Sequence, residues 1–195
     1  MSEYEIYTRI LSPCLKPENQ RVLVEDLGYS LHMANIIEDK KTIYSLYRYD
    51  QVEQKNLFLP FFNNSHDGEM DKSECPTLED LLKFCDYILL AEKNDRLFVL
   101  LLELKSGNNG DAHKQLEASA TFMEYVKNTA IRIAEVNGYL NFKKENIKLK
   151  KIVLKPAPKV RPLTNKSKSK QLKVDYEAPI IYYTANSLPL YCFCR

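Results

Sequence analysis

The sequence contains no apolar run long enough to cross a membrane, because charged residues interrupt its hydrophobic stretches. Its first residues, MSEYEIYTRI, lack a basic segment followed by an apolar core, so no secretory signal is expected. We therefore expect a cytoplasmic protein that does not associate with membranes.

A zinc-binding pattern is also missing. The five cysteines are scattered, Cys192-X-Cys194 has no second pair, and the three histidines lie far apart. The cysteines are expected to be reduced thiols in the core or on the surface, which agrees with a cytoplasmic location.

The net charge is only +2, so the protein as a whole is not expected to bind nucleic acid through its charge. The distribution of charge is uneven, because positions 155–173 contain seven Lys or Arg and no acid. These are Lys155 and Lys173 at the ends and, between them, Lys159, Arg161, Lys166, Lys168 and Lys170. Three prolines and alternating Ser and Lys predict a flexible basic loop here. It is either a solvated linker or an arm whose five inner basic residues contact phosphates.

The chain has 195 residues, of which 45 % are hydrophobic and 28 % charged, an ordinary composition for a globular protein. This length suits a single domain over residues 1–195 and is short for two. No internal repeat is visible.

Hydrophobic periodicity and turn residues predict an α/β fold, with a mixed central β-sheet flanked by helices. Strands are expected at 42–49, 85–91, 97–102, 147–154 and 178–184, and helices at 21–27, 78–84 and from Asp111 to about Val136. The core-facing stripe of the longest helix is expected to comprise Leu116, Ala120, Met123, Val126, Ala130 and Ile133. Residues 4–15 fit a helix or a strand, and the apolar tail at 187–195 is expected to pack against the domain or a partner.

Three charged residues interrupt the two central strands. The run from Leu97 to Leu102 is apolar throughout, which is typical of a strand buried on both faces. Glu103 and Lys105 follow it, and Asp86 lies in the preceding strand. Charges at such positions are costly unless they are paired or bind a metal, so they indicate a site.

The hairpin between these strands brings the three charges together. A two-residue turn at 94–95 pairs Asp86 with Glu103, and alternation places Lys105 on the same face. Directly paired Cβ atoms lie ~4.5–5.5 Å apart, and two carboxylates that close repel each other unless a cation lies between them. Mg²⁺ prefers oxygen ligands of this kind. One extra turn residue would break the pairing.

These residues resemble the PD-(D/E)XK nuclease superfamily, and the phrases CDYILL and FVLLLELKSG are similar to its small bacterial members. Asp86 matches the first acidic position, Glu103-Leu104-Lys105 the (D/E)-X-K tripeptide, and Gln115 the glutamine that many members carry on the following helix. The resemblance covers residues 78–126, and it departs from the pattern in having Cys85 where a proline usually stands.

The resemblance implies a restriction-endonuclease-like fold and metal-dependent hydrolysis of phosphodiester bonds, most often in DNA. Asp86, Glu103 and the Leu104 carbonyl would then hold Mg²⁺, for which Mn²⁺ can substitute. Lys105 would orient or activate the attacking water. Small bacterial members often act in restriction, repair or phage defence, so such a role is expected.

Gln115 has two interpretations, since a neutral amide there could position the water or Lys105, or could cap backbone groups. Other polar residues fit a solvated surface better than the site. They are Glu25 and Asp26, either of which could be the helix acid that many members bring near the metal, His66 and Asp67 on a polar loop, Glu79 and Asp80 in a helical first turn, and His113.

A second hypothesis comes from another functional class. The same fold could serve as a nucleic-acid-binding or scaffold subunit of a larger complex without cleaving its ligand, and the apolar tail and small net charge favour this slightly. A protein partner or a homo-oligomer would be compatible with the sequence. A plain interaction module without any site is the third alternative.

Overall fold

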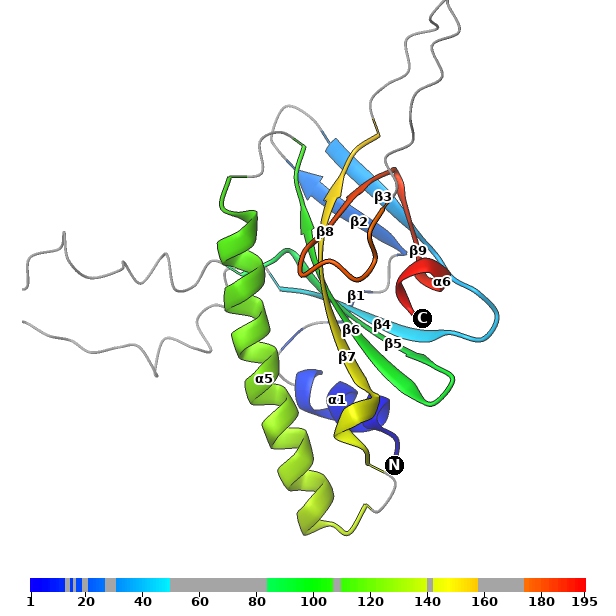
Figure 1. Cartoon of the computed structure of the whole chain (residues 1–195), viewed down its shortest axis with the longest axis vertical. Helices are drawn as coiled ribbons and strands as arrows, with labels where there is room; N and C mark the ends of the chain where they lie inside the picture. The colour runs from blue at the N-terminus through cyan, green and yellow to red at the C-terminus, as the bar shows by residue number, and fades with distance from the viewer. Residues whose placement is uncertain are drawn as a thin grey trace, which may run out of the picture.

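The computed structural model describes residues 1–12, 15, 17–18, 21–26, 31–49, 84–106, 110–139, 142–157 and 174–195. It is a mixed α/β structure (Figure 1). Its helices are α1 (Glu3–Leu11), α5 (Ala112–Val136) and α6 (Leu190–Phe193), with a 3-10 turn η1 (Lys144–Asn146). Its strands are β1 (Pro17–Glu18), β2 (Val22–Asp26), β3 (Leu31–Ile37), β4 (Ile43–Arg48), β5 (Tyr87–Lys93), β6 (Arg96–Leu104), β7 (Ile147–Lys155), β8 (Ile181–Thr184) and β9 (Ser187–Pro189).

The main sheet has the strand order β1-β4-β5-β6-β7-β8. Strands β4, β5 and β6 form an antiparallel meander, whereas β7 lies parallel to β6 and β8 parallel to β7. A parallel neighbour needs a crossover connection, and α5 supplies it between β6 and β7. The carboxyl ends of these three parallel strands therefore meet at one edge of the sheet.

The two faces of the main sheet are covered differently. Helices α1 and α5 cover one face, where Tyr7, Leu116 and Met123 pack with Val99 and Leu101 of β6. A small sheet of order β2-β3-β9, together with α6, covers the other face (Figure 1). The long helices α1 and α5 therefore flank one face, whereas the other face is covered by a second sheet and the four-residue helix α6. Along β6, odd-numbered residues face α5 and even-numbered residues face the small sheet.

The hairpin prediction is confirmed. Lys93 pairs with Arg96, so the loop contains two residues, and Asn94 and Asp95 have φ of 52° and 57°. Positive φ at both central positions is what a two-residue loop with the twist of the flanking strands requires, and Asn and Asp tolerate it better than most residues. Every residue of β6 after Arg96 is buried, as expected for a strand covered on both faces.

The predicted helix at 21–27 is wrong, because residues 22–26 form strand β2. This strand pairs antiparallel with β3, a strand that the sequence pattern did not predict. Leu23 is fully buried, and the Tyr87 hydroxyl both accepts a hydrogen bond from Val24 N–H and donates one to its carbonyl, each at 3.0 Å. Tertiary pairing thus decides the conformation of a segment whose local pattern is amphipathic.

Several other predicted elements are present, whereas β1, β9 and α6 were not predicted. Residues 4–15 are resolved in favour of a helix, α1, and the expected strands at 42–49, 147–154 and 178–184 correspond to β4, β7 and a shorter β8. Helix α5 ends where expected, with Gly138 at φ 67°. The expected loop at 63–75 and residues 78–83 of the expected helix lie outside the described residues, while Phe84 belongs to no helix.

The apolar tail packs against the rest of the structure through part of its side chains, while Tyr191 is 50 % exposed. Leu188, Leu190 and Phe193 are each 0 % exposed and pack with the small sheet and β6. In the part of the chain that the structure describes, no helix combines the length and the hydropathy needed to span a bilayer.

Candidate functional site

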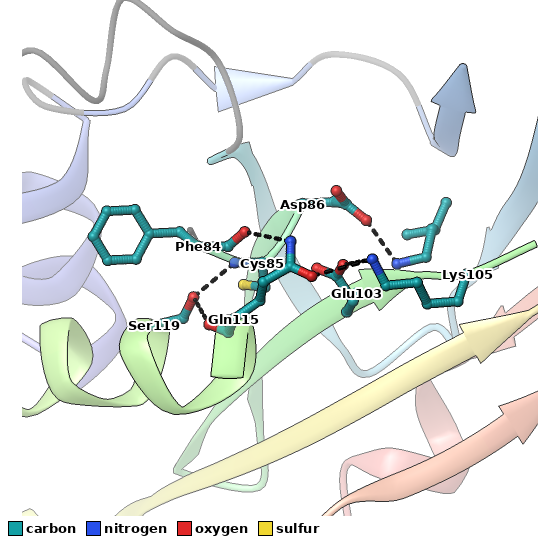
Figure 2. A network of polar contacts seen from close by, with 8 residues as sticks. Phe84, Cys85, Asp86, Glu103, Lys105, Gln115 and Ser119 are labelled. Atoms are coloured by element: carbon teal, nitrogen blue, oxygen red, sulfur yellow. Dashed lines mark hydrogen bonds and ion pairs between the residues drawn. The ribbon is translucent and has the colours of Figure 1, made fainter. Parts of the chain in front are cut away.

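The candidate site lies at the carboxyl end of β6, on the face that α5 covers (Figure 2). The β5–β6 ladder extends to Tyr87 with Leu102, and one further step in the same register places Asp86 opposite Glu103. Lys105 follows β6 directly, and Gln115 lies in the first turn of α5. The structure therefore brings the four predicted catalytic residues together.

Asp86 is held through both its side chain and its backbone. Its Oδ2 accepts a hydrogen bond from Leu104 N–H at 2.6 Å, and its carbonyl accepts one from Tyr49 N–H at 2.8 Å. The carboxylate is half-buried. A charge-assisted bond from the backbone restricts where the carboxylate can lie, so Asp86 is fixed against the end of β6.

Glu103 is almost fully buried, with 1 % of its surface exposed. Its Oε1 lies 2.6 Å from Lys105 Nζ, and the Lys105 side chain is 22 % exposed. Burying a carboxylate without a partner is costly, and the neighbouring ammonium offsets that cost. Glu103 and Lys105 are therefore paired with each other, while Asp86 accepts a backbone hydrogen bond.

Gln115 makes contacts that are compatible with both interpretations that the sequence left open. Its Oε1 accepts a hydrogen bond from Lys105 Nζ at 3.1 Å, and its Nε2 donates one to the Phe84 carbonyl at 3.3 Å. An ammonium can only donate and a carbonyl can only accept, so these two partners define the orientation of the amide. Gln115 thus links the segment before Asp86 to Lys105.

Ser119 belongs to this network, and sequence reasoning missed it. It is 0 % exposed, its Oγ accepts a hydrogen bond from Cys85 N–H at 2.8 Å, and it donates one to the Gln115 carbonyl at 2.8 Å. The buried face of α5 includes Ser119 and Ala134, whereas the expected Ala120 and Ile133 are only half-buried. A serine within an apolar helical stripe, four residues after Gln115, is the signal that could have indicated it.

Cys85 lies beside the two carboxylates, in surroundings that disfavour its thiolate form. Burial, together with the nearby negative charges of Glu103 and Asp86, raises the pKa of its thiol. Its Sγ donates a hydrogen bond to the Tyr87 carbonyl at 3.3 Å. The reactive form of a cysteine is the thiolate, and this thiol stays protonated.

Other candidate residues do not join the site. Glu25 and Asp26 belong to β2, in the layer that covers the opposite face of the main sheet, so the expectation of a helix acid at these positions is wrong. His113 is exposed and lies 3.7 Å from Glu117, as expected for a surface residue. Several predictions fall outside the described residues: His66, Asp67, Glu79, Asp80, Lys159, Arg161, Lys166, Lys168 and Lys170.

Lys155 is the basic residue of the predicted loop that lies among the residues the structure describes. It ends β7, and the Lys105 N–H donates a hydrogen bond to the carbonyl of the preceding residue, Leu154, at 3.0 Å. Val153 packs in the core beneath α5, so alternation places Lys155 on the same face as Glu103 and Lys105. A second ammonium therefore stands one strand away from the candidate site.

The donor set at this site fits a hard divalent cation such as Mg²⁺. It offers two carboxylates, and the Leu104 carbonyl follows the same side of β6 as the N–H that contacts Asp86. Among the described residues, no group of three or more His, Cys, Asp or Glu gathers that could hold a metal ion. The pair Asp86 and Glu103 would thus need backbone, water or substrate oxygens to complete the coordination, as Mg²⁺ sites commonly do.

Comparison with known proteins gives no relative from which a function could be transferred. No protein-family model, no curated protein and no solved structure matches this chain. The arrangement of Asp86, Glu103, Lys105 and Gln115 is therefore the basis for any functional conclusion.

Proposed function

We propose that this protein is a metal-dependent nuclease with a restriction-endonuclease-like fold that hydrolyses phosphodiester bonds in DNA. The observation that carries the proposal is the gathering of Asp86, Glu103, Lys105 and Gln115 at the end of one buried strand. Asp86 lies directly before β5, Glu103 near the end of β6, Lys105 directly after it and Gln115 in α5. Glu103, Lys105 and Gln115 contact one another, and Asp86 contacts the Leu104 N–H. The mixed sheet with α1 and α5 on one face supports the proposed fold.

The charge of the site suits a cation and then a phosphate. Two carboxylates and one ammonium give one net negative charge, which favours a divalent cation. Asp86, Glu103 and the Leu104 carbonyl would hold it, and the site would then be net positive. When bound, Mg²⁺ polarises the scissile phosphate and lowers the pKa of a water molecule beside it.

Lys105 would supply the chemistry at the attacking water. Its ammonium is held between Glu103 Oε1 and Gln115 Oε1, on the face of the sheet that carries both carboxylates. From this position it would orient the water and offset the charge that develops on the phosphorane. Gln115 would keep the ammonium in place by accepting from it.

Substrate binding would continue from the site along the edge of the sheet. Lys155 stands beside Lys105, and the basic segment at 155–173 begins there. A phosphate backbone that crosses the ends of β6 and β7 would meet both ammonium groups in succession. This arrangement supports a polynucleotide substrate over a small phosphate ester. A role in restriction, repair or phage defence would be compatible with this activity.

The alternative hypothesis, a non-catalytic scaffold subunit, was favoured by two observations, the apolar tail and the small net charge. The structure weakens the first of them. The apolar tail at 187–195 suggested a surface for a protein partner, but Leu188, Leu190 and Phe193 are buried within their own domain. A non-catalytic subunit also has no need for a paired carboxylate and lysine at the end of its most buried strand.

The test is cleavage by the purified chain. Supercoiled plasmid, linear duplex, single-stranded DNA and RNA are incubated with Mg²⁺, with Mn²⁺ and with a chelator. We expect metal-dependent cleavage of DNA and none with the chelator. Calorimetric titration with Mn²⁺ gives a second readout. If the folded protein binds no divalent ion and cuts none of these substrates, the nuclease proposal fails and the scaffold alternative gains.

A further inference from the structure

We propose that Ser119 is a positioning residue that acts with Gln115 to set the place of Asp86 relative to Glu103 and Lys105. This inference rests on the proposed nuclease function for its catalytic meaning. Its structural content, the control of Asp86 by α5, can be tested without cleavage. Nothing in the sequence motif assigns a role to Ser119.

The contacts of Ser119 and Gln115 converge on a single peptide group. Gln115 Nε2 donates to the Phe84 carbonyl and Ser119 Oγ accepts from the Cys85 N–H, and these two groups belong to the same amide (Figure 2). The bond is trans, so its C=O and N–H point in opposite directions. Helix α5 therefore holds this peptide group at both ends.

The spacing of the two side chains matches this arrangement. Residues four apart on a helix lie one turn apart on the same face, with Cβ atoms about 5–6 Å from each other. The Gln115 amide, as a donor, and the Ser119 hydroxyl, one turn later, as an acceptor can thus both bind one peptide group that lies along the helix. The Ser119 hydroxyl also donates to the Gln115 carbonyl, which orients its lone pairs toward Cys85 N–H.

Asp86 is the next residue along the chain, so the two hydrogen bonds to the peptide group between Phe84 and Cys85 restrict its position. Only the backbone dihedrals of Cys85 separate the held peptide group from Asp86, and the Cys85 side chain is 0 % exposed. On its other side, the Asp86 carbonyl accepts from Tyr49 N–H of the segment after β4. The carboxylate is thereby presented to the Leu104 N–H.

Gln115 also connects this peptide group to Lys105. One end of its amide holds the Phe84 carbonyl and the other end accepts from Lys105 Nζ. A shift of the 84–86 segment along α5 would therefore move Asp86 and disturb Lys105 together. Ser119 touches neither the proposed metal ion nor the substrate, so its effect passes through these residues.

The test compares Ser119→Ala with Ser119→Thr and with a matched control. Alanine removes the acceptor for Cys85 N–H, whereas threonine keeps a hydroxyl that can also bond the carbonyl four residues earlier. Thr121→Ala is the control, because Thr121 Oγ1 donates to the Glu117 carbonyl at 3.1 Å on the exposed side of the same helix, away from the site.

We expect Ser119→Ala to weaken Mn²⁺ affinity by about 10- to 100-fold in calorimetry, as is typical for the loss of an outer-shell partner. Single-turnover cleavage should fall with it, Ser119→Thr should recover most of both, and Thr121→Ala should match the wild type. Metal affinity in folded Ser119→Ala equal to that of the wild type would overturn the inference.

Amide hydrogen exchange separates this inference from the proposed function. The Leu104 N–H is protected by the Asp86 carboxylate, so Ser119→Ala should accelerate its exchange although Ser119 does not contact Leu104. This readout holds even if the wild type binds no metal and cuts nothing, in which case only the proposed function fails. Unchanged Leu104 exchange, with faster exchange confined to Cys85, would show that Ser119 only satisfies a local backbone group.

Discussion

Lys105 Nζ lies 2.6 Å from Oε1 of Glu103, a carboxylate that is 1 % exposed. The ammonium proposed to act on the attacking water is therefore also the counter-ion of a buried carboxylate. Lys105 therefore has two roles, one in stability as the counter-ion of Glu103 and one in the proposed chemistry as a hydrogen-bond donor to water. A bound divalent cation can replace Lys105 in the first role but not in the second, so the two roles can be measured separately.

Lys105→Met should destabilise the metal-free protein by about 2 kcal/mol in urea denaturation. Removing one partner of a buried ion pair costs roughly 3–5 kcal/mol, and the partial exposure of Lys105 reduces that figure. Added Mg²⁺ stabilises the native state because it binds that state only. The gain in the free energy of unfolding should be larger in the mutant than in the wild type, since Mg²⁺ there supplies the missing counter-ion of Glu103. Single-turnover cleavage should still fall by ~10²–10⁴.

Lys151→Met is the matched control for this substitution. Lys151 Nζ lies 2.6 Å from Glu117 Oε2, the same separation, but Glu117 is 47 % exposed and lies outside the site. Its loss should cost under about 1 kcal/mol and should not depend on Mg²⁺. Full cleavage activity in Lys105→Met would reduce the Glu-Leu-Lys tripeptide to a structural ion pair.

Asp86→Asn should leave the fold intact and weaken metal binding. The Asn side-chain oxygen can still accept from Leu104 N–H, but the negative charge that a cation requires is gone. We expect a loss of Mn²⁺ affinity greater than the ~10–100-fold typical of outer-shell partners, and no detectable cleavage. Asp111→Asn, an exposed acid paired with Lys114 at 3.4 Å, serves as the comparison and should behave as the wild type. Wild-type cleavage by Asp86→Asn would place the active site elsewhere.

Replacing Lys159, Lys166, Lys168 and Lys170 by Gln should weaken DNA binding and reduce its salt dependence. Each lost phosphate contact lowers the slope of log affinity against log salt by ~0.9 for B-form DNA. Lys155→Gln should remove one such contact and lower the slope accordingly. Lys144→Gln should leave the slope unchanged, because Lys144 is an exposed residue before the start of β7. Fluorescence anisotropy over a salt series measures the slope, and an unchanged slope would identify the segment as a linker.

Asp39 lies away from the candidate site, and Asp39→Asn should remove a contribution to the free energy of unfolding that depends on pH in the acid range. Hydrogen bonds from Lys93, Thr42 and the Lys41 N–H lower the pKa of Asp39 from 3.8 to about 2. A carboxyl group with a depressed pKa stabilises the fold above its unfolded pKa and loses this effect as pH falls toward its folded pKa. The stability difference between wild type and mutant should therefore shrink between about pH 5 and pH 2 in denaturation experiments. A constant difference across this range would contradict the assignment.

The hairpin, the buried strand and the long helix around the candidate site could be predicted from the sequence alone. Asn94 and Asp95 are suited to positive φ, residues 97–102 are continuously apolar, and residues 112–136 repeat with helical periodicity. These are local signals, in which the conformation follows from residues close together in the chain. Because the turn sets the register, the placement of Asp86 one step beyond the Tyr87–Leu102 pair, opposite Glu103, could be predicted as well.

Three features depend on contacts between distant parts of the chain and could not be predicted locally. They are strand β2, the second sheet, and the hydrogen bonds from α5 to the peptide group between Phe84 and Cys85. Strand β2 depends on pairing with β3, and β3 in turn pairs with β9, more than a hundred residues later in the chain. The contacts of Gln115 and Ser119 depend on the distance and rotation at which α5 packs on the sheet. Periodicity indicates which side of a helix is buried, but the atoms that a buried polar group meets are set by the packing of distant segments.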